Sequence, residues 1–79
     1  MNNRLKAIIE ENGWSQKEFA DFSGIAQGTI NKIANKRMPK VSNKLKNKIH
    51  IAINEHSKRG SYKLEDIFPV ALEDMENIL

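Results

Sequence analysis

The 79-residue chain contains no cysteine and no long run of apolar residues. Small secreted proteins usually depend on disulfides, so the absence of cysteine indicates a cytoplasmic protein and excludes a zinc site built on cysteine. The longest uninterrupted apolar run is three residues, as at 7–9, which is too short to cross a membrane. Residues 1–4 contain no apolar stretch, so we do not expect a signal peptide.

Residue patterns that carry out catalysis are also lacking. His50 and His56 lie six positions apart, do not share a helical face, and have no H-E-x-x-H context. The chain has no glycine-rich phosphate loop, and Ser15 is explained by helix capping. A chain of this length buries only about 60% of its unfolded surface, which leaves little room for a deep pocket. We therefore expect no enzyme activity, no metal ion and no cofactor.

The formal charge of +3 is distributed unevenly along the chain. Residues 1–31 carry three basic and four acidic side chains, whereas residues 32–63 carry ten basic side chains against Glu55 alone, a net +9. Residues 64–79 carry five acidic side chains and no basic one. The central segment favours a polyanionic partner such as a nucleic acid, although a solvated lysine-rich surface would have the same composition.

Apolar residues recur at three- and four-residue spacing, which predicts an all-α fold, a compact bundle of five short helices. Asn2 or Asn3 is expected to cap the first of them. The helices are expected from about 3 to 12, from 15 to about 23, from about 26 to before Pro39, from Ser42 to a turn at 57–61, and from 64 to 68. The expected inward-facing residues of the first four are Leu5, Ile8 and Ile9; Phe19, Ala20 and Phe22; Ile30, Ile33 and Ala34; and Leu45, Ile49, Ala52 and Ile53.

The second helix has the clearest start signal in the sequence. Ser15 and Glu18 have the spacing of a capping box, in which each side chain bonds the other residue's backbone N–H. Trp14 and Phe19 flank this box at the spacing of a hydrophobic staple. The sequence therefore predicts a sharply defined helix beginning after Ser15.

The C-terminal residues are more acidic than the rest of the chain. We expect residues 1–69 to form the folded domain and residues 70–79 to form an acidic tail. Leu72, Met75 and Leu79 recur at helical spacing, so the tail is either a sixth amphipathic helix or a frayed end. Its apolar residues could make a dimer contact or pack on the core, and the sequence does not separate these alternatives.

Residues 23–25 form a very short link between the second and third helices, which is the helix-turn-helix arrangement. The segment Gln16–Asn35 closely resembles the helix-turn-helix unit of the phage Cro/CI-type repressors, the XRE-like family. The matching positions are the small residue Ala20, the turn glycine Gly24, the apolar residues Ile25, Ile30 and Ile33, and a recognition-helix segment, 27–32, similar to that of lambda-type Cro. The resemblance covers about residues 4–68 and implies a lambda repressor-like fold. The chain departs from the family at Gly28, where a base-reading side chain is common, and in a longer connection at 54–61.

The resemblance implies a transcriptional regulator that binds double-stranded DNA as a homodimer, through the major groove of a pseudo-palindromic operator. Two alternatives stay open: the antitoxin of a toxin–antitoxin pair with the same DNA-binding unit, and a protein–protein interaction module. A contact with a toxin or with RNA polymerase is not resolved by the sequence.

The candidate DNA-contacting residues follow from this resemblance and from side-chain chemistry. Glutamine can bond adenine in two places, lysine can donate to guanine, and a threonine methyl can pack on thymine. Cations beside the recognition helix bind phosphates without reading sequence. The expected base-reading residues are Gln27, Gly28, Thr29, Asn31 and Lys32, and the expected phosphate-binding residues are Gln16, Lys36, Arg37, Lys40 and Lys44. The acidic tail is further expected to limit non-specific DNA binding by repelling phosphates.

Overall fold

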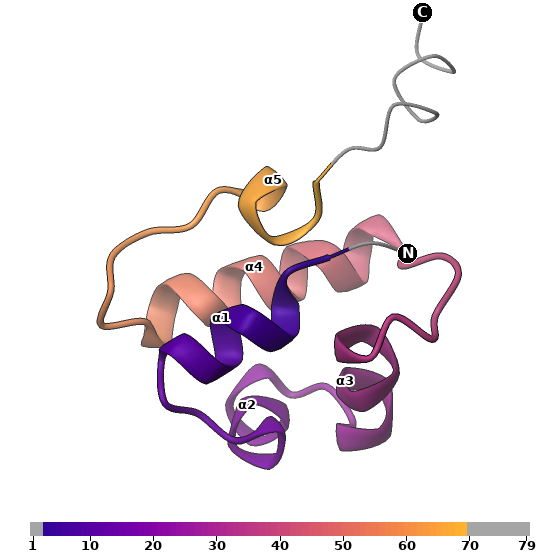
Figure 1. Ribbon diagram of the computed structural model, residues 1–79, viewed down its shortest axis with the longest axis horizontal. Coiled ribbons are helices and arrows are strands. Elements are labelled where there is room, and N and C mark those ends of the chain that lie inside the picture. Colours follow the sequence, from indigo (N-terminus) through magenta and orange to yellow (C-terminus); the bar gives the residue numbers. More distant parts are fainter. Residues whose placement is uncertain (1–2, 70–79) are drawn as a thin grey trace, which may run out of the picture.

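The computed structural model describes residues 3–69, and within them the chain forms five α-helices and no strand (Figure 1). The helices are α1 (Leu5–Glu11), α2 (Gln16–Ser23), α3 (Gln27–Ala34), α4 (Asn43–His56) and α5 (Leu64–Ile67). The prediction of an all-α fold of five short helices is confirmed. None of the described helices is long and apolar enough to cross a membrane. The predicted tail at 70–79 lies outside the described residues.

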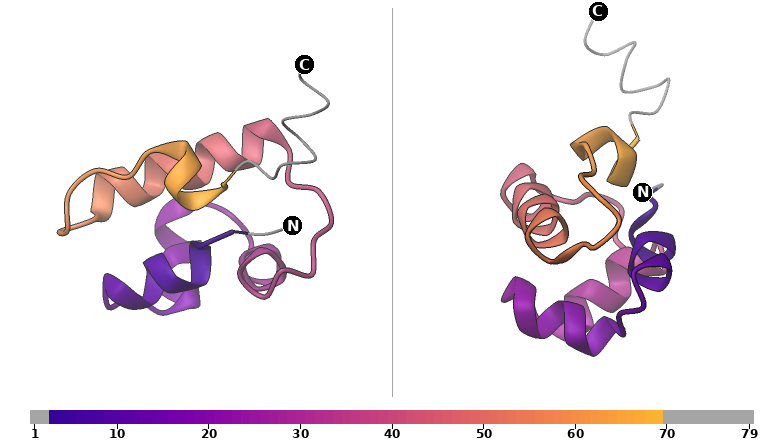
Figure 2. Two further views of the ribbon diagram at one scale, coloured as in Figure 1. Left: turned by 45° about the horizontal axis from the view of Figure 1, so that its top comes forward. Right: turned by 90° about the vertical axis from the view of Figure 1, so that its left-hand side faces the viewer.

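The helices pack around one apolar core. Helix α2 contacts both α3 and α4, α1 contacts α3, and α5 contacts α4. In the left view of Figure 2, α4 and α5 lie above α1, α2 and α3, with α3 seen nearly along its axis. The longest helix, α4, therefore forms one side of the molecule, and α3 has a free outer side.

The core is built from the apolar stripes that the sequence predicts. The largest fully buried side chains are Leu5, Ile8, Phe19, Ile30, Ile33, Ile49, Ile53 and Ile67. Phe22 and Leu45, also predicted to face inward, are half-buried at the edge of this core. Burial of one such side chain stabilises the fold by about 1.5–3 kcal/mol relative to its exposure. The stripes therefore fix which face of each helix remains free.

The start of α2 has the predicted geometry. The Glu18 backbone N–H donates to Ser15 Oγ at 3.0 Å, and the Ser15 N–H donates to Glu18 Oε1 at 3.1 Å. The rings of Trp14 and Phe19 stack with their centroids 5.9 Å apart. The capping box and the contact between the two staple residues are therefore confirmed.

The prediction for the start of α1 is wrong in detail. The helix begins at Leu5 with Arg4 as its N-cap, and Arg4 makes no side-chain capping bond. Asn3 lies one position further out, where its Oδ1 accepts the Leu5 N–H at 3.0 Å and its Nδ2 donates to the Ile33 carbonyl at 2.9 Å. The buried Asn3 side chain thus bonds α3 as well as its own helix, which local capping rules do not predict.

The third helix ends earlier than the basic run suggests. Its last residue is Ala34, and Lys36 adopts a left-handed backbone conformation with φ +61°. The Lys36 N–H donates to the Ile33 carbonyl at 3.0 Å, and the Arg37 N–H donates to the Lys32 carbonyl at 2.8 Å. These two bonds form a Schellman motif, which usually has glycine at the left-handed position. A lysine there gives no sequence signal for a helix end.

The long connection between α4 and α5 is bonded to the end of α1. Asn54 bonds both backbone groups of Tyr62, accepting its N–H at 2.7 Å and donating to its carbonyl at 3.0 Å. The Tyr62 hydroxyl donates to the Glu11 carboxylate and accepts a bond from Asn12 Nδ2. Burial, followed by the bond to Glu11, raises the pKa of the Tyr62 hydroxyl above its ordinary value. Arg59 Nε donates to the Glu11 carbonyl at 2.6 Å, so the connection is fixed at several points.

Candidate nucleic-acid interface

The relative placement of α2 and α3 is set by the turn between them. Gly24 adopts a left-handed conformation with φ +72°, which an L side chain rarely adopts. The Ser23 hydroxyl donates to the Ala20 carbonyl and accepts the Ile25 N–H, both at 3.3 Å. Ala20 and Ile25 are buried between the helices. The turn, the small residue and the apolar contact together hold α3 at a fixed angle to α2.

Helix α3 has one buried and one exposed face. Ile30, Ile33 and Ala34 are buried, and Thr29 is half-buried. The other base-reading candidates are exposed on the outer face: Gln27, Gly28, Asn31 and Lys32. The structure thus brings these four predicted residues together on one surface, with Thr29 at its edge.

Two of these positions have particular features. Gln27 is the first residue of α3, and the preceding N-cap, Ala26, makes no side-chain capping bond. Gly28 has open space around it: a Cβ built there would meet no atom within 4 Å. No contact within the described residues therefore explains the absence of a side chain at Gly28.

A hydrogen bond links the two helices at this surface. Asn31 Nδ2, on α3, donates to Gln16 Oε1, at the start of α2, at 3.1 Å. Since this bond uses the oxygen of the Gln16 amide, the Gln16 Nε2 group is left to donate elsewhere. The sequence predicted both residues as DNA contacts, but it did not predict that they bond each other. The bond depends on how α2 and α3 cross, which no local pattern encodes.

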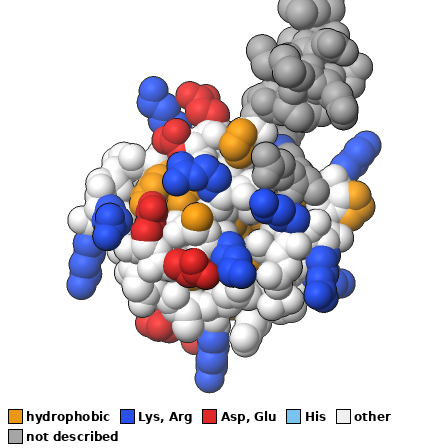
Figure 3. Space-filling view, in the orientation of Figure 1, with side chains coloured by type: hydrophobic (Ala, Val, Ile, Leu, Met, Phe, Trp, Pro, Cys, Tyr) orange, Lys and Arg blue, Asp and Glu red, His pale blue; other side chains and the backbone are white. Residues whose placement is uncertain are grey.

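The predicted phosphate-binding cations lie after α3 along the chain. Lys36, Arg37 and Lys40 are exposed on the segment between α3 and α4, and Lys44 is exposed in the first turn of α4. On the face drawn in Figure 3, Lys and Arg side chains lie on all sides, acidic side chains lie among them on the left and in the centre, and the right-hand edge carries Lys and Arg alone. In that orientation α3 and the segment leading to α4 lie on the right (Figure 1). The predicted cations are therefore exposed on the segment that directly follows α3.

Other cations of residues 32–63, which carry the net charge of +9, contact groups of the fold. Lys46 Nζ lies 5.7 Å from the centre of the Phe68 ring, a cation–π contact. Lys48 Nζ donates to the Gly24 carbonyl at 3.5 Å, near the C-terminal end of α2, where a positive charge is favoured. These contacts and the bond from Arg59 show that part of the positive charge supports the fold.

The described residues hold no group of three or more His, Asp or Glu side chains that could bind a metal ion.

The helix-turn-helix family model matches residues 5–43, which span α1, α2, α3 and the first residue of α4. No curated protein matches the chain. The match agrees with the confirmed capping box, the turn at Gly24 and the exposed face of α3. Residues 5–43 therefore form a helix-turn-helix domain of the Cro/CI-type, XRE-like family, and such a domain implies DNA binding.

Proposed function

We propose that the protein is a sequence-specific repressor that inserts α3 into the major groove of an operator. The exposed face of α3 carries the proposal: Gln27 and Lys32 are exposed on it, and exposed cations follow directly along the chain. Residues 1–69 form the DNA-binding domain in this proposal. We place the protein in the cytoplasm, where an operator would be accessible.

Base reading is assigned to the outer face of α3. Gln27 enters the groove first and bonds adenine N6 and N7 through its amide, and Lys32 donates to guanine O6 and N7. Thr29 packs on a thymine methyl from the edge of the face. Gly28 lets the backbone approach the base pairs closely, because it has no side chain to hold them apart. Asn31 contacts a base or a phosphate at the edge of the bases that α3 reads, while it remains bonded to Gln16.

The proposed phosphate contacts surround the bases that α3 reads. Gln16 Nε2 and the N-terminal end of α2 donate to one backbone phosphate. Lys36, Arg37, Lys40 and Lys44 neutralise further phosphates and release counterions, which gives affinity without sequence information. A single unit of this kind reads only a few base pairs, so two copies binding half-sites one helical turn apart would supply the required specificity. The proposed functional unit is therefore a homodimer on a pseudo-palindrome.

Selection of binding sites from random DNA, followed by a salt titration, tests this proposal. The expected result is an enriched pseudo-palindrome whose affinity falls steeply with salt. The matched control is Lys58→Gln, which removes one exposed cation from the α4–α5 connection, away from α3. Lys40→Gln should flatten the salt slope by about one, whereas Lys58→Gln should leave it unchanged. No enrichment, or binding that is indifferent to salt, would contradict the proposal.

A further inference from the structure

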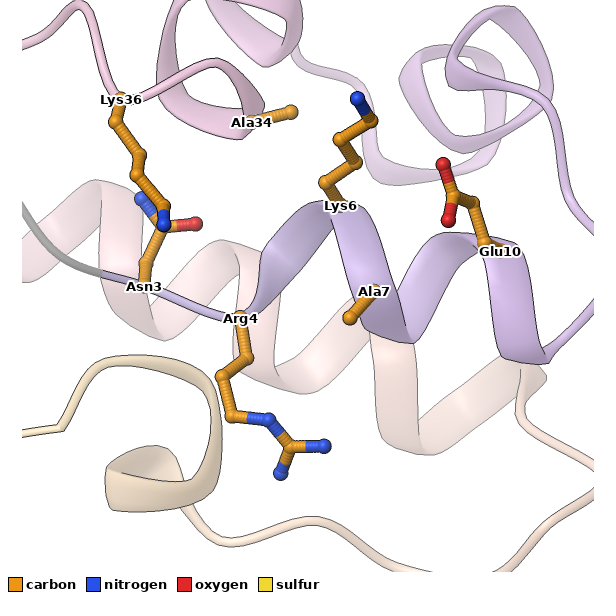
Figure 4. A pocket seen from close by; sticks show the side chains of 7 residues that line it. All are labelled: Asn3, Arg4, Lys6, Ala7, Glu10, Ala34 and Lys36. Carbon is orange, nitrogen blue, oxygen red and sulfur yellow. The ribbon is translucent and has the colours of Figure 1, made fainter.

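The C-terminal end of α3 is joined to the start of α1 by the side chain of Asn3. Its Nδ2 donates to the Ile33 carbonyl at 2.9 Å, and its Oδ1 accepts the Leu5 N–H at 3.0 Å. Figure 4 shows Asn3 at the start of α1, with its side chain directed towards the end of α3. One buried side chain, 6% exposed, therefore bonds a group that lies 30 positions away in the sequence.

The bond from Asn3 is not needed to satisfy the Ile33 carbonyl. The Lys36 N–H donates to the same oxygen at 3.0 Å, as one of the two bonds that end α3. A carbonyl oxygen has two lone pairs, so the Asn3 bond is additional to the local ending of the helix. The local bonds fix where α3 stops, whereas the Asn3 bond orients this end of α3 relative to α1.

Apolar packing between α1 and the end of α3 is sparse beside Asn3. The small side chains of Ala7 and Ala34 help to line a hollow of about 380 Å³ between the two helices (Figure 4). Apolar contacts are not directional, and a hollow leaves room for a helix to shift. A buried hydrogen bond is directional and is stronger in the low-dielectric interior than in water. The Asn3 bond is therefore well suited to restrain this end of α3.

The start of α3 is held independently of Asn3. The turn at Gly24 and the buried Ile25 fix it against α2. The bond from Asn31 to Gln16 also restrains α3, but this bond is exposed, so water competes for it. Loss of the Asn3 bond would therefore leave the start of α3 in place and allow its C-terminal end to tilt.

Such a tilt has different consequences along the helix. The eight residues of α3 span about 12 Å, so a displacement of its C-terminal end by about 1 Å tilts the axis by about 5°. The Cα atom of Lys32, five positions after Gln27, would then move by about 0.6 Å, and that of Gln27 hardly at all. Binding groups must be held within about 0.5 Å of their productive positions. The tilt therefore affects the base that Lys32 contacts more than the base that Gln27 contacts.

We propose that Asn3 is a positioning residue, which holds the tilt of α3 through its bond to the Ile33 carbonyl and so determines the preference for the base that Lys32 contacts. The restraint on α3 follows from the observed bonds alone, whereas its effect on base preference rests on the proposed function. Because Asn3 is buried, it acts through α3 without touching DNA.

Two variants at position 3 separate the two bonds. Asn3→Ser keeps an oxygen that can accept the Leu5 N–H, but its side chain is too short to reach Ile33, whereas Asn3→Ala removes both bonds. Affinities for the selected operator and its single-base variants are measured where circular dichroism shows each protein to be folded. Gln27→Ala and Lys32→Ala identify the two bases. Both Asn3 variants should lower discrimination at the Lys32 base by roughly three- to tenfold and leave discrimination at the Gln27 base unchanged. Loss in Asn3→Ala alone, or equal loss at both bases, would overturn the proposal.

The matched control is Ser57→Ala, at the C-terminal end of α4. Ser57 Oγ donates to Asn12 Oδ1 at 2.8 Å and accepts the Arg59 N–H at 3.1 Å, so this variant also loses two side-chain bonds, neither of which involves α3. It should lower stability without changing base discrimination. The same loss of discrimination in Ser57→Ala would mean that reduced stability, and not the tilt of α3, is responsible, which would overturn the proposal.

Amide hydrogen exchange tests the restraint without DNA. The Lys36 and Arg37 N–H groups bond the carbonyls at the end of α3, and Asn3→Ser should speed their exchange by about two- to tenfold. The Gly24 N–H, which bonds the Ala20 carbonyl at the end of α2, should exchange at an unchanged rate. Unchanged exchange at Lys36 and Arg37 would contradict the restraint. If the native chain selects no operator, the proposed function and the base preference fail together, whereas faster exchange would still support the restraint on α3.

Discussion

Replacing Lys36 by glycine should stabilise the fold while weakening DNA binding. Lys36 is the one non-glycine residue with positive φ in the described part of the chain, at +61°. A left-handed conformation costs an L residue roughly 1–2 kcal/mol, because its Cβ approaches the following carbonyl. Glycine avoids this cost but loses about 0.5–1 kcal/mol through its greater freedom in the unfolded chain.

The difference between these ranges is a net gain in unfolding free energy of up to about 1.5 kcal/mol, with a central value of about 0.75 kcal/mol. For a domain of this size the central value raises Tm by about 3–6 °C. Thermal unfolding followed by circular dichroism measures it. In parallel, the loss of one phosphate contact should flatten the salt dependence of DNA binding by about one.

The matched control is Lys36→Ala, which removes the same charge but keeps a Cβ in the left-handed conformation. It should give no stabilisation, yet it should weaken DNA binding as much as Lys36→Gly. Because both variants lose the same charge, their difference in Tm isolates the backbone effect. Equal Tm values for the two variants would refute the reasoning about strain at Lys36.

Three other predictions follow from single contacts. Ser15→Ala removes half of the capping box and should lower the unfolding free energy by about 0.5–2 kcal/mol, measured by urea denaturation; an unchanged midpoint would contradict the capping role. The folded-state pKa of Tyr62 is raised, so its contribution to stability is complete below the ordinary pKa near 10 and is lost as pH rises past it; Tyr62→Phe should flatten the alkaline decline, and identical pH profiles would count against this. Gln16→Ala and Asn31→Ala should be non-additive in operator affinity, with a coupling of about 0.5–3 kcal/mol in a double-mutant cycle, and simple additivity would indicate independent side chains.

The sequence predicts most of the fold because its signals are local. The capping box at Ser15, the turn glycine Gly24 and the apolar stripes each depend on neighbouring residues, and all are confirmed. The exact start of α1 is not predicted by local rules, because Arg4 makes no side-chain capping bond and Asn3 bonds α3 as well as its own helix. The end of α3 is not predicted, because a lysine at a left-handed position gives the same sequence signal as any exposed lysine.

The candidate interface likewise combines features that the local sequence predicts with features that depend on how the helices pack. Helical spacing is sufficient to place Gln27, Asn31 and Lys32 on one exposed face. The bond between Asn31 and Gln16 joins residues 15 positions apart and depends on the crossing of two helices. Likewise, Asn3 reaches the Ile33 carbonyl only because the start of α1 lies next to the end of α3. These features require the packed structure, since no sequence pattern specifies distances between separate helices.

The affinity of Gln27→Ala for the selected operator and for each of its single-base variants is the most direct test of base reading by α3. The account predicts a loss of about 1–3 kcal/mol for the operator, relaxed preference at one base position, and an unchanged salt slope. Lys40→Ala should instead weaken binding to all sequences alike and flatten the slope. Full operator affinity in Gln27→Ala, or a loss shared equally by all sequences, would contradict the claim that the exposed face of α3 reads the bases.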